Sequence, residues 1–392
     1  MTTASEPTRW VRFGTSSNQD PERAVAEALA PVLELGQPKL AILFCSPAQD
    51  LTQVSRLVKA AIGENEVIGC SSAGELIRDH ALSGGLVIWA LGGEGFKVTT
   101  GFGLGTPEQG LRNAAAQAAS CIEQLERRQH TLLFLLADGL CGDQMEVVRG
   151  AYDVCGAQVP LMGGCAGDDM ALQSTRQIHA GALLTHAVVA AAITSDAPLA
   201  IGIAHGWTPL SEPMLVTDSQ GTTVVSLDDR PALDVYLDAY DAPAEVREDP
   251  AAFFRFAHTR PIGIARRNRT EIRYVYSADY DKRTVTVFAE VPQGAMAYLM
   301  QGSCTSVLEA TAEVCALAEE SLEGHPACGF MVLECVARKS LLDQEGLLDA
   351  SLRLPTVKEG ISVGGFYTYG EIARTDGAGG LHNQTVVALA VA

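Results

Sequence analysis

The chain has 392 residues, of which 47% are hydrophobic and 19% are charged, so it can bury sizeable cores and is not disordered. Its 47 acidic residues outnumber its 28 basic residues, which gives a formal net charge of −19 at pH 7. Because so acidic a surface repels phosphate groups, we expect no binding to nucleic acid or to membranes. No segment has about 18 unbroken apolar residues, so we predict no membrane-spanning helix.

The beginning of the chain and the cysteines indicate a cytoplasmic protein. Residues 1–10 lack the basic and then apolar pattern of a signal peptide. The ten cysteines lie mostly in apolar runs and form no C-x-x-C pair, which is typical of reduced, buried thiols. No histidine pair has zinc-ligand spacing, and neither a P-loop nor a dinucleotide fingerprint is present. We therefore predict no metal and no cofactor.

Three parts of the chain have the same order of predicted elements. In each part an amphipathic helix precedes a continuous apolar strand, and a second helix leads to a Gly-rich turn and a further apolar strand. The first helix begins with Asp20 and Pro21, a capping residue followed by proline. Apolar strands flanked by helices predict a mixed α/β fold of tandem strand–helix–strand units. In the first part, the first strand, the turn and the last strand lie at 40–46, 68–76 and 85–92. In the second part they lie at 131–138, 162–170 and 182–194, and in the third part at 329–338, 363–372 and 385–392.

The segment from 210 to 300 has a different pattern from the three units. It contains short strands of β-branched residues joined by polar, Pro-rich loops, such as 241–250. We interpret it as a β-rich insertion before the third unit, with a domain boundary near 225–250.

The turns and two later motifs resemble those of the FIST family. This resemblance implies a FIST N-terminal domain over 30–225 and a FIST C-terminal domain over 228–375, with the last strand at 385–392 completing the second. The motifs are IGCSSAGE at 68–75, PLMGGCAGD at 160–168, AHGWT at 204–208, GFYTYGEI at 365–372 and LHNQT at 381–385.

The resemblance also implies a function, because the family consists of intracellular sensory proteins that bind small ligands and transduce signals. Amino acids are among the ligands proposed for it, and no catalytic activity defines it, so we expect no enzyme. A subgroup that binds haem and senses nitric oxide is the alternative. Since the sequence shows no output module, we expect a separate signalling partner, such as a histidine kinase, a cyclic-nucleotide enzyme or a chemoreceptor.

The Gly-rich turns are the candidate ligand site. Backbone N–H groups in such turns can hold a carboxylate, and an acidic side chain can hold an ammonium group, so together they suit a free amino acid. We expect Glu75 and Glu371 to point into one cavity between the two regions, although the same acids can also act only as turn caps. The predicted ligand-binding residues are Cys70, Ser71, Ser72, Glu75, Gly164, Asp168, Tyr367, Tyr369, Glu371 and His382.

Three further features leave alternatives open. A thiol at Cys70 or Cys165, or the Ser71 hydroxyl, is the candidate nucleophile of a Cys- or Ser-dependent hydrolase, but no base lies near them in sequence. His205 is a candidate haem ligand or a hydrogen-bonded, partly buried side chain. The basic cluster at 265–269 is a docking patch or a solvated loop.

Overall fold

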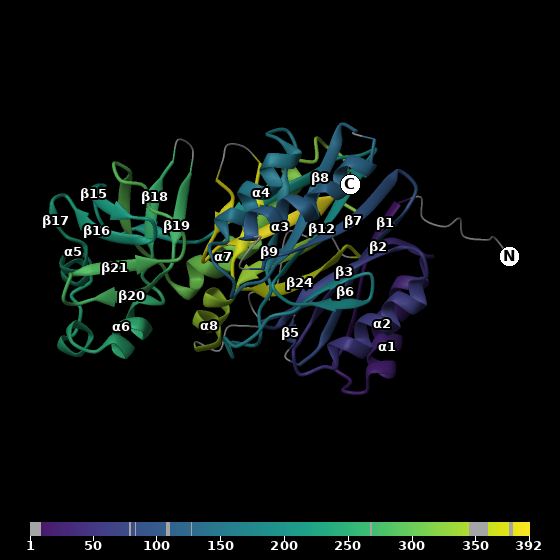
Figure 1. Cartoon of the computed structure of the whole chain (residues 1–392), viewed down its shortest axis with the longest axis horizontal. Coiled ribbons are helices and arrows are strands. Elements are labelled where there is room, and N and C mark those ends of the chain that lie inside the picture. The colour runs from purple at the N-terminus through teal and green to yellow at the C-terminus, as the bar shows by residue number, and fades with distance from the viewer. Residues whose placement is uncertain are drawn as a thin grey trace.

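The computed structural model describes residues 9–77, 80–82, 84–106, 110–126, 128–266, 269–344, 360–375 and 379–392. These residues form a body of three six-stranded sheets and a lobe that contains a nine-stranded sheet. The lobe lies at one end of the molecule, on the left in Figure 1. In the described part of the chain, no helix is both long enough and apolar enough to cross a membrane. The predicted mixed α/β class is confirmed.

The first sheet of the body has the strand order β1-β6-β2-β3-β10-β11. Strands β2 and β3 are parallel, and the other neighbours are antiparallel. Helix α1 (Pro21–Leu33) begins as predicted, because the Asp20 side chain accepts a hydrogen bond from the Arg23 N–H. Helix α2 (Leu51–Ile62) packs with α1 on the sheet. The strands are β1 (Arg9–Ser16), β2 (Pro38–Cys45), β3 (Glu66–Ser71), β6 (Leu86–Gly93), β10 (Gln177–His179) and β11 (Ala182–Leu184).

The second sheet has the order β7-β12-β8-β9-β25-β26, and the third has the order β13-β27-β23-β24-β4-β5. The helices that accompany them are α3 (Gly110–Ala119), η1 (Ser120–Gln124), α4 (Met145–Cys155), α7 (Cys304–Glu320) and α8 (Val336–Gln344). The second sheet contains β7 (Phe96–Leu104), β8 (His130–Ala137), β9 (Leu161–Cys165), β12 (Ala187–Ser195), β25 (Glu371–Arg374) and β26 (Leu381–His382). The third contains β4 (Glu75–Ile77), β5 (His80–Leu82), β13 (Leu199–Ala204), β23 (Gly329–Cys335), β24 (Ser362–Thr368) and β27 (Val386–Val391).

The three sheets have one pattern, in which a hairpin from a different part of the chain completes each sheet. Hairpin β10–β11 pairs with β3, hairpin β25–β26 with β9, and hairpin β4–β5 with β24. Each hairpin therefore covers an edge that would otherwise expose unpaired backbone groups. The region predicted as one strand at 182–194 is divided between β11 and β12, because the chain turns at His186, where φ is 48°.

The core explains why the predicted strands are apolar on both faces. The inner faces of all three sheets meet in one buried cluster, in which the rings of Phe44 and Phe366 stack 4.4 Å apart. The outer faces pack against the helices in separate clusters. Both faces of each central strand are consequently removed from water.

The lobe spans Thr208 to Gln301, in close agreement with the predicted insertion. It has its own buried core and its own helices. The predicted domain boundary at 225–228 lies within its sheet, since the adjacent strands β15 and β16 form a hairpin there. The division into two domains stays a prediction. The elements are β14 (Thr208–Pro209), β15 (Met214–Gln220), β16 (Thr223–Leu227), β17 (Arg230–Pro231), α5 (Ala232–Ala239), η2 (Ala244–Arg247), α6 (Pro250–Ala257), β18 (Ile262–Ala265), β19 (Thr270–Arg273), β20 (Val275–Asp279), β21 (Thr284–Val287) and β22 (Met296–Gln301).

Candidate functional site

The two predicted glutamates occupy corresponding positions in the fold. Glu75 and Glu371 are the first residues of β4 and β25, and the corresponding first residue of β10 is Gln177. Each side chain accepts a hydrogen bond from a backbone N–H just before or at the start of the next long strand. The donors are Gly85 for Glu75 at 3.1 Å, Ala187 for Gln177 at 3.2 Å and Thr385 for Glu371 at 3.3 Å. The sequence pattern matched Asp168 to the two glutamates, whereas the structure gives this place to Gln177.

Burial determines the protonation of these glutamates. Both side chains are fully buried, and burial raises the pKa of Glu75 and of Glu371 to about 8. Hydrogen bonds with Ser72 and Thr385 act in the opposite direction but do not reverse the shift. At neutral pH the two carboxyl groups are therefore mostly uncharged, as the amide of Gln177 is. Neither side chain lines either of the two cavities described below.

Asp168 has a different structural role from the two glutamates, because it fixes the conformation of the loop that follows β9. Its carboxylate accepts hydrogen bonds from the N–H groups of Leu172, Gln173 and Ser174 at 2.9, 2.7 and 2.9 Å. The Tyr369 hydroxyl also donates to it, at 2.5 Å. Burial alone raises the pKa of Asp168, but these hydrogen bonds outweigh it and hold the pKa below its usual value. Asp168 is thus ionised and fixes the loop next to Tyr369.

The remaining predicted residues of the turns lie inside the protein. Cys70 is fully buried, and burial raises the pKa of its thiol well above the usual value. The Ser71 hydroxyl donates to the Gly167 carbonyl at 2.7 Å and accepts from the Arg176 N–H at 2.9 Å. A buried thiol with a raised pKa is a poor nucleophile, and the Ser71 bonds serve the turn, so neither arrangement supports hydrolase chemistry.

Three other positions contribute to packing. Gly164 pairs with Glu371 across the sheet, and an added Cβ there would lie 2.8 Å from the Thr368 hydroxyl oxygen. Tyr367 is buried, with the Lys339 ammonium 5.3 Å from its ring centroid. The Cys165 thiol is buried too, and burial raises its pKa. A ligand-binding role for the predicted turn residues stays a prediction.

The two candidate histidines are engaged with the backbone. The His205 Nδ1 atom accepts a hydrogen bond from the Trp207 N–H at 3.0 Å, and His382 Nε2 lies 2.9 Å from the Ala373 carbonyl oxygen. Burial lowers the pKa of each ring to about 4, so both are neutral at pH 7. His382 Nε2 must then carry the proton, and haem ligation through that atom would require loss of this bond. Among the described residues, no group of three or more His, Cys, Asp and Glu side chains is arranged to hold a metal ion.

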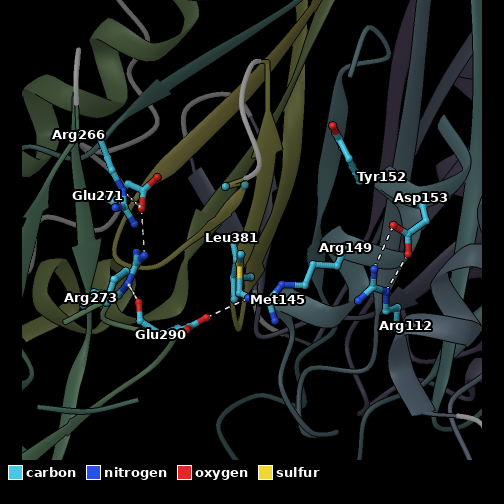
Figure 2. Close-up of a pocket in the computed structure, with 13 residues that line it drawn as sticks. Arg112, Met145, Arg149, Tyr152, Asp153, Arg266, Glu271, Arg273, Glu290 and Leu381 are labelled. Carbon is cyan, nitrogen blue, oxygen red and sulfur yellow. Dashed lines mark hydrogen bonds and ion pairs between the residues drawn. The ribbon is translucent and has the colours of Figure 1, made fainter. Parts of the chain in front are cut away.

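The structure reveals a cavity of about 440 Å³ between the body and the lobe, which we call the arginine cleft. Figure 2 shows its two walls: residues of α3 and α4 on one side and residues of the lobe on the other. Four arginines and three carboxylates line it, so the lining carries one net positive charge in a chain of net charge −19. The charged residues are Arg112, Arg149, Arg266 and Arg273 with Asp153, Glu271 and Glu290.

The helix wall presents guanidinium groups that are partly open to solvent. Arg112 and Asp153 form a two-point ion pair across α3 and α4, at 2.7 and 3.1 Å. Arg149 binds Glu146 on its own helix and reaches Glu290 of the lobe at 2.9 Å. The side chains of Arg112 and Arg149 are 51% and 38% exposed. Arginine has five N–H donors, so each retains donors for an incoming carboxylate.

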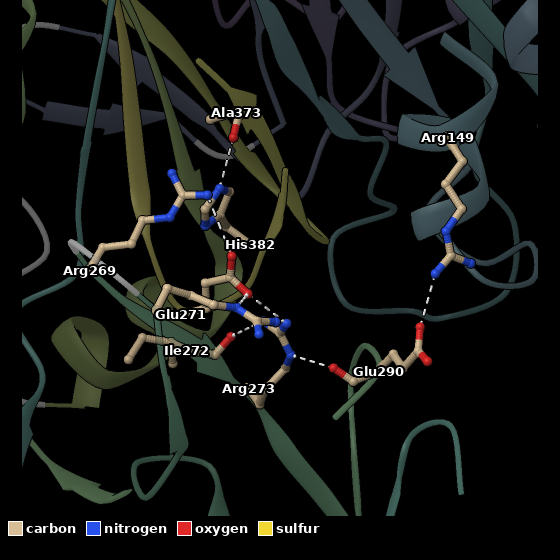
Figure 3. Close-up of polar contacts among 9 residues, drawn as sticks. Arg149, Arg269, Glu271, Ile272, Arg273, Glu290, Ala373 and His382 are labelled. Atoms are coloured by element: carbon tan, nitrogen blue, oxygen red, sulfur yellow. Dashed lines mark hydrogen bonds and ion pairs between the residues drawn. The ribbon is translucent and has the colours of Figure 1, made fainter. Parts of the chain in front are cut away.

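The lobe wall is built around Glu271 on β19 (Figure 3). Its carboxylate accepts from Arg266 and Arg273 at 3.0 Å each and from Arg269 at 3.4 Å. Burial raises the pKa of Glu271, but the charges of Arg273 and Arg266 outweigh burial and lower it. Of these groups, Arg266, Arg273 and Glu271 line the cleft, and with Glu290 they make the lobe wall neutral, so the net positive charge of the lining comes from the helix wall.

One predicted site residue lies beside this wall, and one basic cluster belongs to it. His382 follows Leu381, which lines the cleft, and its ring interacts electrostatically with Arg269, Glu271 and Arg273. Arg266 and Arg269 come from the predicted basic loop, and they fold onto Glu271. That cluster was the sequence signal for the lobe wall. The helix wall had no comparable signal, because Arg112 and Arg149 are isolated in sequence.

Comparisons with known proteins agree with the motif pattern. The FIST N domain matches residues 39–230, and the FIST C domain matches residues 232–374. No curated protein matches the sequence. A crystal structure of a chorismatase aligns with a TM-score of 0.36 and 11% sequence identity, covering 100% of both chains, a similarity too low to carry an argument. FIST domains are sensory domains of signal transduction that bind small ligands. Because the two domains together span nearly the whole sequence, the chain belongs to the FIST family.

Proposed function

We propose that this protein senses an amino-acid-like metabolite in the arginine cleft and transmits its binding to a separate signalling partner. The observation that carries the proposal is the pairing of guanidinium and carboxylate groups on two facing walls (Figure 2). A zwitterionic ligand presents a carboxylate and an ammonium group, and it requires both kinds of partner in one cavity. The volume of about 440 Å³ is within the range of small-ligand pockets.

The exposed residues of the cleft suggest how such a ligand would be held. Its carboxylate would receive hydrogen bonds from Arg149 and Arg112, since a guanidinium group matches the planar geometry of a carboxylate. Its ammonium group would lie beside Glu290 or Asp153, which are 49% and 45% exposed. Glu271 is nearly buried and already has three arginine partners, so its task would be to position the lobe wall.

The same geometry supports a route from binding to signalling. The Arg149–Glu290 ion pair joins α4 of the body to the lobe across the cleft. A ligand that binds both groups would replace a direct contact with a bridged one, and it would change how the lobe is held against the body. A ligand shifts such an equilibrium only through different affinities for the two arrangements. The signalling partner would bind the two positions of the lobe with different affinities.

Arg149→Met is expected to weaken binding of the responding amino acid at least tenfold, because charge-assisted hydrogen bonds contribute about 1.5–3 kcal/mol each. The measurement is a thermal-shift screen of amino acids at millimolar concentration, followed by calorimetric titration of each compound that stabilises the protein. Without ligand, the variant should melt close to wild type, because exposed ion pairs contribute only about 0–1 kcal/mol.

The matched control is Arg230→Met, which removes an exposed arginine paired with Asp238 on the lobe, outside the cleft. This control should bind the amino acid with wild-type affinity. The proposal fails if no amino acid stabilises the wild-type protein, or if Arg149→Met and Arg112→Met both bind the responding compound as wild type does.

A further inference from the structure

A second cavity of about 350 Å³ lies between the body and the lobe, and we call it the aromatic slot. Its lining is largely aromatic and aliphatic, unlike that of the arginine cleft, and it shares no residue with that cleft. The volume is within the range of small-ligand pockets. The lobe contributes Phe254, His258, Tyr274, Tyr276 and Phe288 to its lining.

The lobe side of the slot is a continuous series of rings. Ring centroids are 6.5 Å apart for Phe254 and His258, 5.6 Å for His258 and Tyr274, and 6.5 Å for Tyr274 and Tyr276. Phe288 follows, 6.5 Å from Tyr276. Side chains from α6 and the residue after it, from β20 and the residue before it, and from the residue after β21 thus present an extended aromatic wall. Such a wall favours a flat ligand that stacks or meets the rings edge to face.

The body side presents exposed apolar side chains from the turn after β8 and from a strained loop after β9. Leu140, Met170 and Leu172 are 40%, 42% and 57% exposed. Met170 and Leu172 have left-handed backbones, with φ of 65° and 53°, which side chains of this type rarely adopt. Asp168 and Tyr369 hold the loop in this shape. Strain of this kind persists where the surrounding structure enforces it, frequently at ligand sites.

The slot also contains a buried acceptor without a donor. Asn383 lines the slot and is only 2% exposed. Its Oδ1 atom is buried and has no hydrogen-bond partner among the described residues. An unsatisfied buried acceptor costs about 1–3 kcal/mol. Because Asn383 also lines a ligand-sized cavity, a bound ligand can supply the missing donor.

We propose that the aromatic slot is a second ligand site, which binds a flat aromatic metabolite through stacking and through one N–H or O–H donated to Asn383 Oδ1. This site is separate from the arginine cleft and does not depend on the function proposed for that cleft. Among the described residues that line the slot, none is acidic and His258 is the one basic side chain, whose pKa is lowered by burial, so an uncharged ligand fits.

Indole and benzofuran are matched probes, since both are flat bicycles and only indole has an N–H donor. We expect indole to bind the full-length protein in ligand-observed NMR and calorimetric titrations. Benzofuran should bind about 5-fold to 150-fold more weakly, because it leaves Asn383 Oδ1 unpaired. Asn383→Leu should reduce this preference to less than twofold.

Phe254→Ala tests the aromatic wall without relying on a buried position. Phe254 is 42% exposed, so its loss should leave the fold intact and weaken both probes. The matched control is Phe102→Ala, since Phe102 is 41% exposed and lies on β7, outside the slot. Arg112→Met should leave indole binding unchanged, because Arg112 pairs with Asp153 within the body, and this result separates the site from the arginine cleft.

The proposal is overturned if indole does not bind at millimolar concentration. That result is the one expected if the slot accepts only a protein segment. Equal binding of indole and benzofuran to the wild-type protein would also contradict it, because Asn383 would then contribute nothing. If the Phe254→Ala variant binds indole with wild-type affinity, indole binds outside the aromatic slot and the proposal is wrong.

Discussion

At pH 8.5 the double variant Glu75→Gln/Glu371→Gln is expected to be more stable than the wild-type protein by several kcal/mol, whereas the two should be equally stable near pH 4.5. Burial raises the pKa of each carboxyl from 4.5 to about 8. Between these values the folded protein keeps protons that the unfolded chain has released. The stabilisation by these carboxyls is therefore complete below pH 4.5 and is lost as the pH rises through 8.

The size of the effect follows from the shift. One unit of pKa corresponds to about 1.4 kcal/mol, so each carboxyl contributes about 3–5 kcal/mol to the difference between the ends of this range. Glutamine cannot ionise, and it can accept the same backbone hydrogen bond. Gln177 shows that this fold accommodates an amide at the corresponding place in the first sheet.

Urea unfolding of both proteins at intervals from pH 4.5 to pH 8.5 measures this prediction. The comparison of the two proteins removes the contributions of other groups, such as His205 and His382, which are the same in both. Asp50→Asn is the control, because Asp50 is an exposed helix cap and should not alter the pH dependence in this range. A constant difference between the double variant and wild type from pH 4.5 to pH 8.5 would contradict the prediction.

Arg338→Met is expected to destabilise the protein by about 3–5 kcal/mol, because it leaves the buried carboxylate of Glu334 without its ion-pair partner. Both side chains are fully buried, and Arg338 Nε donates to Glu334 at 3.0 Å. The guanidinium also donates to the carbonyls of His205 and Val307, at 2.7 and 2.8 Å, and to the Thr311 hydroxyl at 2.6 Å. It therefore joins α7 and the residue after β13 to β23 of the third sheet.

Thermal and urea unfolding at pH 7 measure this loss. Arg230→Met is again the control, since its ion pair is exposed and its removal should cost less than about 1 kcal/mol. Glu334→Gln/Arg338→Met should recover at least about 1 kcal/mol relative to Arg338→Met, because no buried charge remains unpaired. If Arg338→Met is as stable as the control, the buried pair does not hold α7 to the third sheet.

The sequence alone determined the local elements and the family. Continuous apolar runs and capping residues are local signals, and they located the central strands, helix α1 and the β-rich insertion. The spacing of the Gly-rich turns predicted three repeated units, and the motifs predicted the FIST family, which the two domain matches confirm. These features could be predicted because each depends on residues close together in the chain.

Only the tertiary structure decided which residues occupy equivalent positions in the three sheets and which residues line the cavities. Gln177 matches Glu75 and Glu371 only because hairpin β10–β11 pairs with the first sheet, which the pattern of acids could not show. The arginine cleft brings Arg112 and Arg149 together with Arg266, Glu271 and Arg273, which are distant from them in sequence. Their convergence depends on how the lobe packs against α4, and such long-range packing leaves no periodic signal in the sequence.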